Sequence, residues 1–226
     1  MIPTPDLSHL KAKDYEHVYE PAEDTFILLD ALEEDANELR CSKPRLCFEI
    51  GSGSGCVSTF VGKILGSSSC LYICSDINEY ASRSTLLTGK QNQVSLDPVV
   101  CSLTSAFDHR LKQLGGVDLL VFNPPYVPTY TEEASNAQGD RDIQGSWAGG
   151  SLGMEITNRV LDSLGTILTT TGRFYLVAVK DNDVPAIRRR MEDLHNLKSK
   201  IVLQRRAGRE YLYVIKFFFL DPRIDM

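Results

Sequence analysis

Residues 45–55 read RLCFEIGSGSG, an apolar run of strand length that leads into three closely spaced glycines. The run predicts a buried strand, and the glycines predict a sharp turn after it, because glycine adopts backbone angles that other residues avoid. Residues 56–66 carry apolar side chains at helical spacing and end in glycine, which predicts a helix. Strand, turn and helix together indicate a unit of the kind that builds parallel α/β sheets.

The glycine spacing restricts the ligand that this turn could hold. It reads G-x-G-x-G, whereas dinucleotide-binding loops read G-x-G-x-x-G, and no lysine follows as it does in a P-loop. On its own the turn could equally be a tight strand-to-helix connection. Asp76 adds a second signal, because it ends the next predicted strand, where a carboxylate can accept hydrogen bonds from ribose hydroxyls. Asp76 or Asn78 could instead cap the following helix, but the combined pattern favours a nucleoside without phosphates.

The alternation of strands and helices continues on both sides of this unit. A helix is predicted from Ala22 to about Leu39, and residues 200–219 predict two strands around an Ala-Gly turn. The other predicted strands are 71–76, 97–103, 117–122 and 174–179, and the other helices are 79–91, 105–115, 152–168 and 183–195. We therefore expect a mostly parallel sheet with helices on both faces and one antiparallel strand from the closing hairpin. Ligands should bind beyond the carboxyl ends of its strands.

Composition places the chain among ordinary globular proteins. The 226 residues suit one domain, and hydrophobic residues make up 42% and charged residues 24% of the chain. No apolar run approaches the roughly 18 residues of a membrane helix, and residues 1–17 lack the apolar core of a secretory signal. The net charge of −6 argues weakly against a protein whose main role is to bind nucleic acid.

The six cysteines and four histidines show no spacing that is typical of metal ligands. No cysteine pair reads C-x-x-C, and most cysteines lie in apolar strand-like runs, where they indicate small buried hydrophobes in a reducing compartment rather than disulfides. We therefore expect no metal site, no membrane association, and a cytoplasmic location with the nucleus as a second one.

Residues 117–126 read VDLLVFNPPY, so a predicted buried strand ends at Asn123. A planar –NH₂ group is a poor nucleophile because its lone pair is delocalised, but fixing both N–H bonds aims that lone pair. The Asn123 side-chain oxygen can accept one N–H, and a backbone carbonyl of the same turn can accept the other. Pro124 and Pro125 stiffen the turn, and the Tyr126 ring can pack on the planar group. The alternative is a strand terminator with Asn as an ordinary turn residue.

Six stretches together resemble the eukaryotic HemK-like glutamine methyltransferases, which are S-adenosylmethionine-dependent enzymes with a seven-stranded Rossmann-like class I fold. The stretches are VYEPAEDTFILLDAL (18–32), EIGSGSG (49–55), SDIN (75–78), DLLVFNPPYVP (118–128), WAGGSLGMEI (147–156) and RAGRE (206–210). That family methylates the side-chain amide of the Gln in the Gly-Gly-Gln motif of class I peptide-chain release factors. The resemblance implies the same fold and substrate, S-adenosylmethionine as cofactor, and S-adenosylhomocysteine as product.

The resemblance also implies roles for single residues. The residues expected to contact the cofactor are Thr25, Glu49, Gly51, Gly53, Asp76, Ile77, Ser102, Leu103 and Asn123. The residues expected to contact the substrate are Asn123, Pro124, Pro125, Tyr126 and Trp147, with Asn123, Pro124 and Tyr126 as the catalytic ones. Many relatives carry an acid near the adenine amine, where this chain reads Cys101-Ser102-Leu103. Ser102 is therefore expected to be a weaker partner for that amine.

The resemblance further implies a partner, a small zinc-binding activator subunit. The predicted third strand, 97–103, lies at one edge of such a sheet, and its apolar Val99 and Val100 leave that edge open to another chain. We expect a heterodimer through this edge, with the zinc in the partner.

Bacterial relatives carry a larger N-terminal helical domain, whereas only residues 1–44 precede the first predicted strand here. Residues 1–17 are polar and contain proline, which predicts a loose arm. We expect residues 1–44 to form an arm and a helix that pack on the catalytic domain, and residues 45–220 to form the methyltransferase domain.

Three other functions stay open at this point. The first is methylation of adenine N6 or cytosine N4 amines in nucleic acid, with the base stacked on Tyr126. The second is methylation of a histone lysine, for which the two-acceptor clamp is awkward because the amine must first lose a proton. The third is a catalytically idle partner protein that binds the cofactor for stability.

Overall fold

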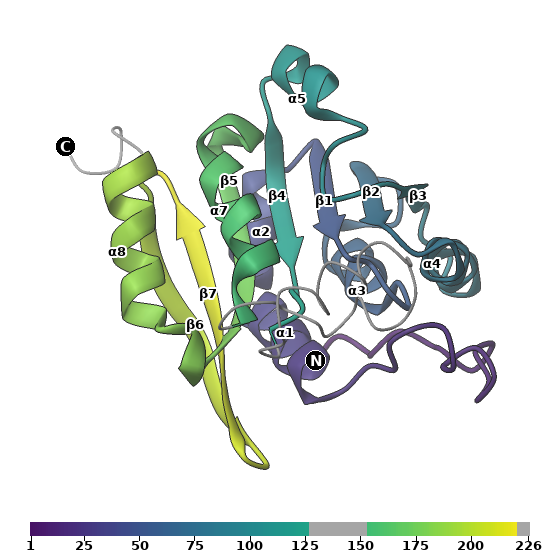
Figure 1. Cartoon of the computed structure of the whole chain (residues 1–226). Coiled ribbons are helices and arrows are strands. Elements are labelled where there is room, and N and C mark those ends of the chain that lie inside the picture. Colours follow the sequence, from purple (N-terminus) through teal and green to yellow (C-terminus); the bar gives the residue numbers. More distant parts are fainter. Residues whose placement is uncertain (127–152, 221–226) are drawn as a thin grey trace.

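The structure is a computed structural model that describes residues 1–126 and 153–220. Its centre is a seven-stranded sheet with the strand order β3-β2-β1-β4-β5-β7-β6 (Figure 1). The strands are β1 (Leu46–Ile50), β2 (Leu71–Asp76), β3 (Asp97–Val100), β4 (Val117–Phe122), β5 (Leu168–Val179), β6 (Lys198–Ala207) and β7 (Glu210–Phe218). All neighbouring pairs are parallel except those of β7, which is antiparallel to both β5 and β6. The predicted mostly parallel sheet with one antiparallel strand is confirmed.

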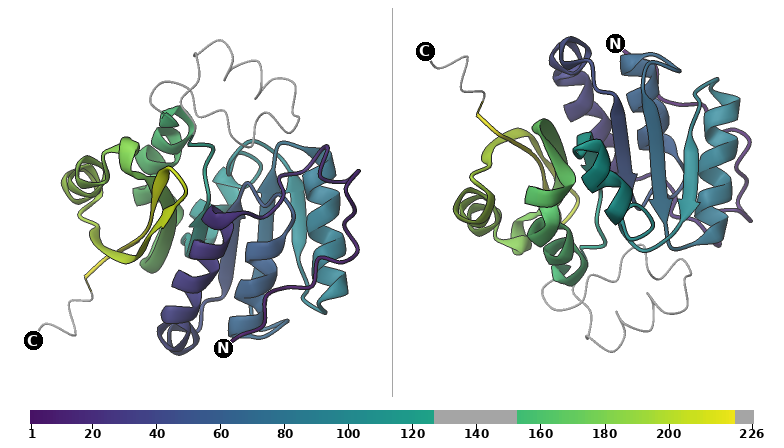
Figure 2. Two further views of the ribbon diagram at one scale, coloured as in Figure 1. Left: turned by 90° about the horizontal axis from the view of Figure 1, so that it is seen from below. Right: turned by 90° about the horizontal axis from the view of Figure 1, so that it is seen from above.

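Helices cover both faces of the sheet, as predicted from the alternation (Figure 2). The helices are α1 (Glu23–Glu34), α2 (Ala36–Ser42), α3 (Cys56–Leu65), α4 (Glu79–Gln91), α5 (Asp108–Leu114), α7 (Glu155–Ile167) and α8 (Val184–His195), with a short 3₁₀ turn at Lys180–Asn182. One apolar core lies between the sheet and α1, α2 and α3, and the other lies between the sheet and α5, α7 and α8. β1 is buried along its whole length because helices cover both faces of the sheet. This is why its sequence reads as a mostly apolar run.

The winding of the sheet reverses between β1 and β4. β1 pairs with β2 on one side and with β4 on the other, and the chain leads from β1 toward β3 before it returns to β4. In doubly wound sheets the loops at such a reversal diverge and leave a crevice at the carboxyl ends of the strands. The glycine turn after β1 and Asn123 after β4 therefore lie on the two sides of one crevice.

The N-terminal arm is not loose, contrary to the prediction. It forms no helix or strand, but it runs alongside α3 and α4 (Figure 1). The backbone N–H of Ile2 donates to Glu33 Oε1 at 2.6 Å, and the side chains of Leu10 and Val18 are buried. The mostly polar composition of residues 1–17 gave no sign of these contacts, which depend on side chains of the folded domain.

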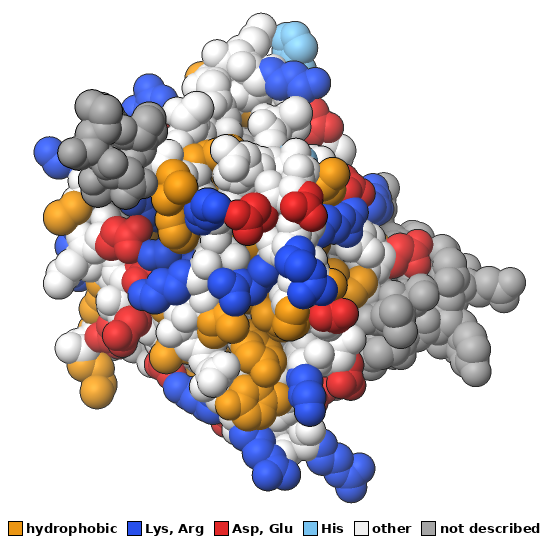
Figure 3. Space-filling view, turned by 90° about the vertical axis from the view of Figure 1, so that its left-hand side faces the viewer, with side chains coloured by type: hydrophobic (Ala, Val, Ile, Leu, Met, Phe, Trp, Pro, Cys, Tyr) orange, Lys and Arg blue, Asp and Glu red, His pale blue; other side chains and the backbone are white. Residues whose placement is uncertain are grey.

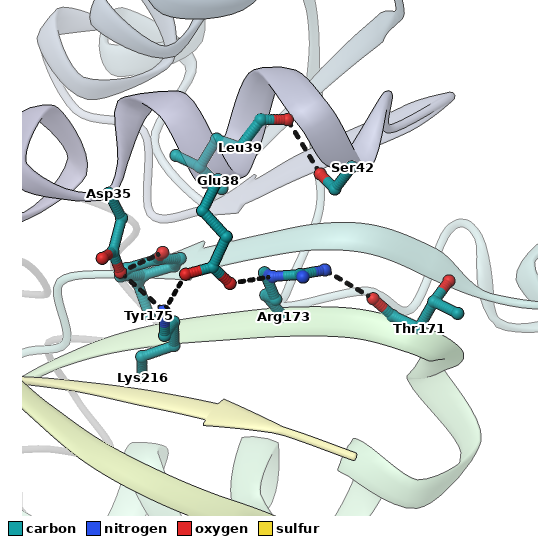
Figure 4. A network of polar contacts seen from close by, with 8 residues as sticks. All are labelled: Asp35, Glu38, Leu39, Ser42, Thr171, Arg173, Tyr175 and Lys216. Carbon is teal, nitrogen blue, oxygen red and sulfur yellow. Dashed lines mark hydrogen bonds and ion pairs between the residues drawn. The ribbon is translucent and has the colours of Figure 1, made fainter. Parts of the chain in front are cut away.

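A buried ion-pair network joins α1 and α2 to the sheet (Figure 4). Lys216 Nζ lies 2.8 Å from Asp35 Oδ2 and 2.6 Å from Glu38 Oε2, and both Lys216 and Asp35 are buried. Tyr175 donates to Asp35 at 2.8 Å, and Arg173 pairs with Glu38 at 2.6 Å. Because one helix pair is fixed to two strands, the network also fixes where the N-terminus of α1 meets the crevice.

Candidate active site

A pocket that opens to solvent lies at the carboxyl ends of β1, β2 and β4, with about 960 Å³ of empty space when the solvent at its mouth is included. Its wall is made by the glycine turn, by Asp76–Asn78, by Leu103, by Phe122–Asn123 and by Asp24–Thr25 at the start of α1. Among the described residues that line it there is no Lys or Arg. The pocket spans the ends of three strands, which leaves room for a nucleoside derivative, and the described part of its wall offers no Lys or Arg for a phosphate.

Hydrogen bonds to β2 fix the shape of the glycine turn. Gly51 and Ser52 both donate their backbone N–H to the Ser75 carbonyl, at 2.8 and 3.1 Å, and Gly53 donates to Asp76 Oδ2 at 3.0 Å. The φ of Gly53 is +51°, and a Cβ built on it would meet no protein atom within 4 Å. The backbone at Gly53 therefore faces open space, where a ligand can approach it closely.

Asp76 is held at the pocket wall by backbone donors. Its Oδ1 accepts from the Asn78 N–H at 2.9 Å, and its Oδ2 accepts from Gly53. Asn78, and not Asp76, is the N-cap of α4, because its side chain accepts from the Tyr80 N–H at 2.9 Å. Burial raises the pKa of Asp76. A carboxylate in this position gains from further hydrogen-bond donors, such as two ribose hydroxyls.

Glu49 is the last residue but one of β1, two positions before the glycine turn, and is only 4% exposed. Its Oε2 accepts from the Ser58 backbone N–H at 2.9 Å and from the Ser58 hydroxyl. Burial raises the pKa of Glu49 to about 8, and the nearby charge of Asp76 adds to this rise. The pocket therefore contains a carboxyl group that would gain much from a positively charged ligand.

Asn123 presents one end of its amide to the protein and keeps the other free. Its Nδ2 donates to Asp24 Oδ2 at 3.0 Å, whereas its Oδ1 is buried and has no hydrogen-bond partner. Two hydroxyls also reach Asp24: the Tyr126 hydroxyl lies 3.3 Å from Oδ2, and the Tyr19 hydroxyl lies 3.1 Å from each oxygen. A buried acceptor without a donor is costly, so this oxygen suits a ligand that brings an N–H.

Comparisons with known proteins agree with this geometry. No family model matches the chain. The mouse protein "Methyltransferase HEMK2" is 44% identical over 96% of this chain and 96% of its own length. The "eRF1 methyltransferase catalytic subunit mtq2" of Schizosaccharomyces pombe is 39% identical over 99% of each chain. The chain belongs to the eukaryotic HemK-like release factor glutamine methyltransferases.

A solved structure has the same fold as this chain. It is the complex of Mtq2 with Trm112 from E. cuniculi, described as responsible for the methylation of the eRF1 translation termination factor. Its matching chain superposes with a TM-score of 0.66 at 24% identity, over 90% of this chain and 99% of that one. A 16S rRNA methyltransferase from T. thermophilus, solved with AdoMet and guanosine, superposes with a TM-score of 0.62 at 13% identity, over 89% of this chain and 44% of that one. The predicted class I methyltransferase fold is confirmed.

The pocket of this HemK-like chain gathers most of the predicted cofactor residues. Those that line it are Thr25, Glu49, Gly51, Gly53, Asp76, Ile77, Leu103 and Asn123. Ser102 does not line it, and its neighbour Cys101 does, because the chain turns away after β3 and Leu103 adopts a left-handed φ of 53°. A contact of Ser102 with the adenine amine stays a prediction, and the pocket wall at this point is made by Cys101 and Leu103.

The predicted substrate residues divide into three groups. Asn123 and Pro125 line the pocket. Pro124 and Tyr126 do not line it, and the Tyr126 hydroxyl is directed to Asp24 instead. Trp147 lies outside the described residues.

Several pocket residues were missed by the motifs. Asp24 stands next to Thr25 in the YEPAEDT stretch. Nothing in the sequence around either residue indicates that Asp24 contacts Asn123. His17, Val18 and Tyr19 also line the pocket. They lie where the arm leads toward α1. The Asn78 side-chain amide holds this stretch by donating to the His17 carbonyl at 2.7 Å.

The parts of the chain that the structure describes contain no group of three or more His, Cys, Asp or Glu side chains that could hold a metal ion. Within residues 1–126 and 153–220, no helix combines the length and apolarity needed to cross a membrane. The six cysteines are free thiols, and the closest pair is Cys47 and Cys70, whose sulfur atoms lie 3.3 Å apart as hydrogen-bond partners.

Proposed function

We propose that this chain transfers a methyl group from S-adenosylmethionine to the side-chain amide nitrogen of the Gln in the Gly-Gly-Gln motif of a class I peptide-chain release factor. The observation that carries the proposal is the buried, unpartnered Oδ1 of Asn123 at the pocket. The names of the relatives support the substrate, since one is an eRF1 methyltransferase catalytic subunit. When bound, S-adenosylmethionine supplies a methyl group on a sulfonium, and it leaves as S-adenosylhomocysteine.

The residues of the pocket fit this cofactor. Asp76 would accept hydrogen bonds from the ribose hydroxyls, and Ile77 and Leu103 would cover the adenine ring. The open backbone at Gly53, with Gly51 beside it, would receive the methionine part. Glu49 would face the positive charge of the cofactor, which would stabilise its ionised form against the effect of burial. The lack of Lys and Arg in the described wall suits a ligand that is cationic and has no phosphate.

The chemical step depends on how the substrate amide is held. The Asn123 Oδ1 would accept one N–H of the Gln side chain, and the Pro124 carbonyl would accept the other. The nitrogen lone pair would then be directed away from both acceptors. On transfer, the S–CH₃ bond of the sulfonium would break as the C–N bond forms, and the amide nitrogen would give up one proton to solvent water. Pro124 and Pro125 keep the turn rigid, so positioning supplies several kcal/mol of the lowered barrier.

The test combines a substrate panel with two variants. Purified chain with its activator would be incubated with methyl-labelled cofactor and a release factor, a histone or DNA, and the modified atom would be mapped by mass spectrometry. We expect label on the Gly-Gly-Gln glutamine alone. Asn123→Ala should lower kcat by at least 100-fold with an unchanged dissociation constant for S-adenosylhomocysteine, whereas Asn37→Ala, at an exposed position on α2, should have no effect. Label on DNA or lysine only would refute the proposal.

We further propose that a small zinc-binding activator subunit adds a strand at the free edge of β3. β3 has only four residues and pairs on one side with β2. Val100 is 44% exposed there, and Tyr80 and Leu87 on the adjacent α4 are 50% and 41% exposed. Exposed apolar residues beside an unpaired edge mark a site for another chain. The complex of Mtq2 with Trm112 supports a partner of this kind.

The opposite edge of the sheet is protected against such pairing. β6 has a bulge between Ile201 and Leu203, and it carries Lys198, Lys200 and Arg205. Figure 3 shows this face, where Lys and Arg side chains surround the hydrophobic ones. Bulges and lysines are the usual means by which edge strands avoid partners. The asymmetry between the two edges supports β3 as the interface.

The partner proposal predicts opposite results for two lysine substitutions. Val100→Lys on β3 should abolish co-purification with the activator, because a charge would be placed in the new strand pairing. Gln204→Lys, at an exposed position of β6, should leave it unchanged. Zinc should be found by metal analysis in the heterodimer and not in the separated catalytic chain. A Val100→Lys variant that binds the activator normally would contradict the interface.

We also propose a cytoplasmic location, with the nucleus as a second one. Free thiols support it, since all six cysteines are unpaired and three of them are buried. Fractionation of cells that express the tagged chain would test it, and recovery from a secretory compartment would refute it.

A further inference from the structure

We infer that Asp24 is a positioning residue that decides which end of the Asn123 amide meets the substrate. The inference rests on the proposed function and extends it, because it concerns a residue that acts through Asn123. Asp24 is the second residue of α1 and is 4% exposed. It lies 99 residues before Asn123 in the chain, and α1 brings the two side chains together at the rim of the pocket.

Three side-chain donors converge on Asp24 from two segments of the chain, the turn after β4 and the segment before α1. Asn123 Nδ2 lies 3.0 Å from Oδ2, the Tyr126 hydroxyl lies 3.3 Å from the same oxygen, and the Tyr19 hydroxyl lies 3.1 Å from both oxygens. The described residues include no cation that forms an ion pair with Asp24. The carboxyl group is therefore held by neutral donors, which is the arrangement of an acceptor used to orient other groups.

The two tyrosines remain donors over the physiological range. Burial raises the pKa of Tyr19 and of Tyr126, and the charge of Asp24 raises both further. Their phenol protons therefore remain available to the carboxyl group over the physiological pH range. Asn123 differs from the two tyrosines, because an amide has a donor end and an acceptor end. It could turn either end toward Asp24.

A side-chain amide has nearly the same shape in both orientations, so packing alone does not choose between them. The carboxyl group of Asp24 does choose, because it accepts from the –NH₂ end and repels the carbonyl end. Once Nδ2 faces Asp24, Oδ1 must face the other way, where it is buried without a partner. The site then presents an acceptor to the substrate and selects a substrate group that carries an N–H.

A local role for Asp24 in α1 accounts for only part of its contacts. An acid in the first turn of a helix stabilises it, and Asp24 Oδ1 accepts from the Thr25 N–H at 2.7 Å. The contact with Asn123 uses the other oxygen, Oδ2. The two roles can therefore be separated, because a neutral side chain of the same shape keeps an oxygen for Thr25 but no longer forces the orientation of Asn123.

The experiment uses the heterodimer with its activator and the release factor as substrate. Asp24→Asn keeps the shape and removes the charge, and we expect kcat to fall at least 30-fold while the dissociation constant for S-adenosylhomocysteine changes less than threefold. Asp30→Asn, an acid on the exposed side of the same helix, is the matched control and should keep normal kcat. A role confined to helix stability would lower the melting temperature and the cofactor affinity together with kcat.

An exchanged pair tests the orientation directly. Asn123→Asp alone should be as impaired as Asp24→Asn, because it sets two carboxyl groups against each other. The double variant Asp24→Asn/Asn123→Asp restores a donor at position 24 and leaves an acceptor toward the substrate. We expect its kcat to be at least tenfold above that of Asn123→Asp alone, which also tests the inference if Asp24→Asn proves unstable.

The outcomes separate this inference from the proposed function. If Asn123→Ala is inactive but Asp24→Asn keeps more than half of the normal kcat, the amide clamp stands and the role of Asp24 is refuted. A double variant no better than Asn123→Asp alone also refutes it. If Asn123→Ala remains active on the release factor, the clamp itself is wrong, and the proposed function fails first.

Discussion

The charge of Glu49 should make cofactor binding depend on pH. In the free protein, burial raises its pKa from 4.5 to about 8, so the group is mostly protonated at neutral pH. A bound sulfonium favours the ionised form, so binding should release a proton and tighten as the pH rises toward 8. Glu49→Gln mimics the protonated form and keeps an oxygen for Ser58, and its affinity should be weaker and almost independent of pH.

The size of the change in cofactor affinity follows from the raised pKa of Glu49. Below its pKa the ionised fraction of Glu49 rises tenfold per pH unit, which corresponds to about 1.4 kcal/mol per unit. Between pH 6.0 and 7.5 the affinity can therefore rise by at most about 30-fold, and we expect at least fivefold. The range stops at 7.5 because the α-amino group of the cofactor itself titrates near 8.

The same shift predicts the sign of the stability change. Because the folded pKa is raised, the unfolded chain loses its proton first, so the free energy of unfolding falls as the pH rises from 4.5 toward 8. Integrated to pH 7, this single group lowers it by about 3 kcal/mol. At pH 7 to 8, Glu49→Gln should therefore be more stable than the wild type in the absence of cofactor.

Calorimetry can test the pH dependence of binding, and urea unfolding can test the change in stability. Binding of S-adenosylmethionine would be titrated between pH 6.0 and 7.5 in buffers with different ionisation enthalpies, which report the number of protons released. Urea unfolding at pH 5 and pH 7.5 would compare the wild type with Glu49→Gln. A pH-independent affinity in the wild type, or the same pH dependence in Glu49→Gln, would refute the reasoning.

Three further predictions concern separate parts of the molecule. Asp76→Ala should weaken cofactor affinity at least tenfold by calorimetry, because charge-assisted hydrogen bonds contribute about 1.5–3 kcal/mol each. Lys216→Ala should lower the free energy of unfolding by about 3–5 kcal/mol since it leaves Asp35 buried and unpaired, whereas Lys216→Met should cost less; equal losses in urea unfolding would count against this. Gly153→Ala should lower kcat more than cofactor affinity, because its Cβ would lie 1.9 Å from the Tyr126 carbonyl oxygen; normal kcat would contradict that contact.

The sequence predicted the bounds of helices and strands well where the apolar periodicity agreed with the residues that end or cap an element. β2 and α4 begin and end at the predicted residues, because a buried apolar run ends at Asp76 and Asn78 caps the helix that follows. β3 is shorter than predicted. Its last backbone bond is from the Cys101 N–H to the Asp76 carbonyl, and the left-handed Leu103 then turns the chain away. Apolar residues at its end indicated a strand, but only the neighbouring strand decides how far pairing extends.

The sequence by itself also determined most of the cofactor pocket. The glycine turn, Glu49 and Asp76 each lie at the end of a predicted strand, and the ends of parallel strands meet at one edge of a sheet. The tertiary structure alone decided the partner of Asn123. Asp24 is 99 residues away in the chain, and nothing in the period of a helix or strand specifies a contact across that distance. The contact depends on the order of the strands and on the position of α1, which the Lys216 network holds against the sheet. Both are decided by how buried surfaces fit together in the folded chain.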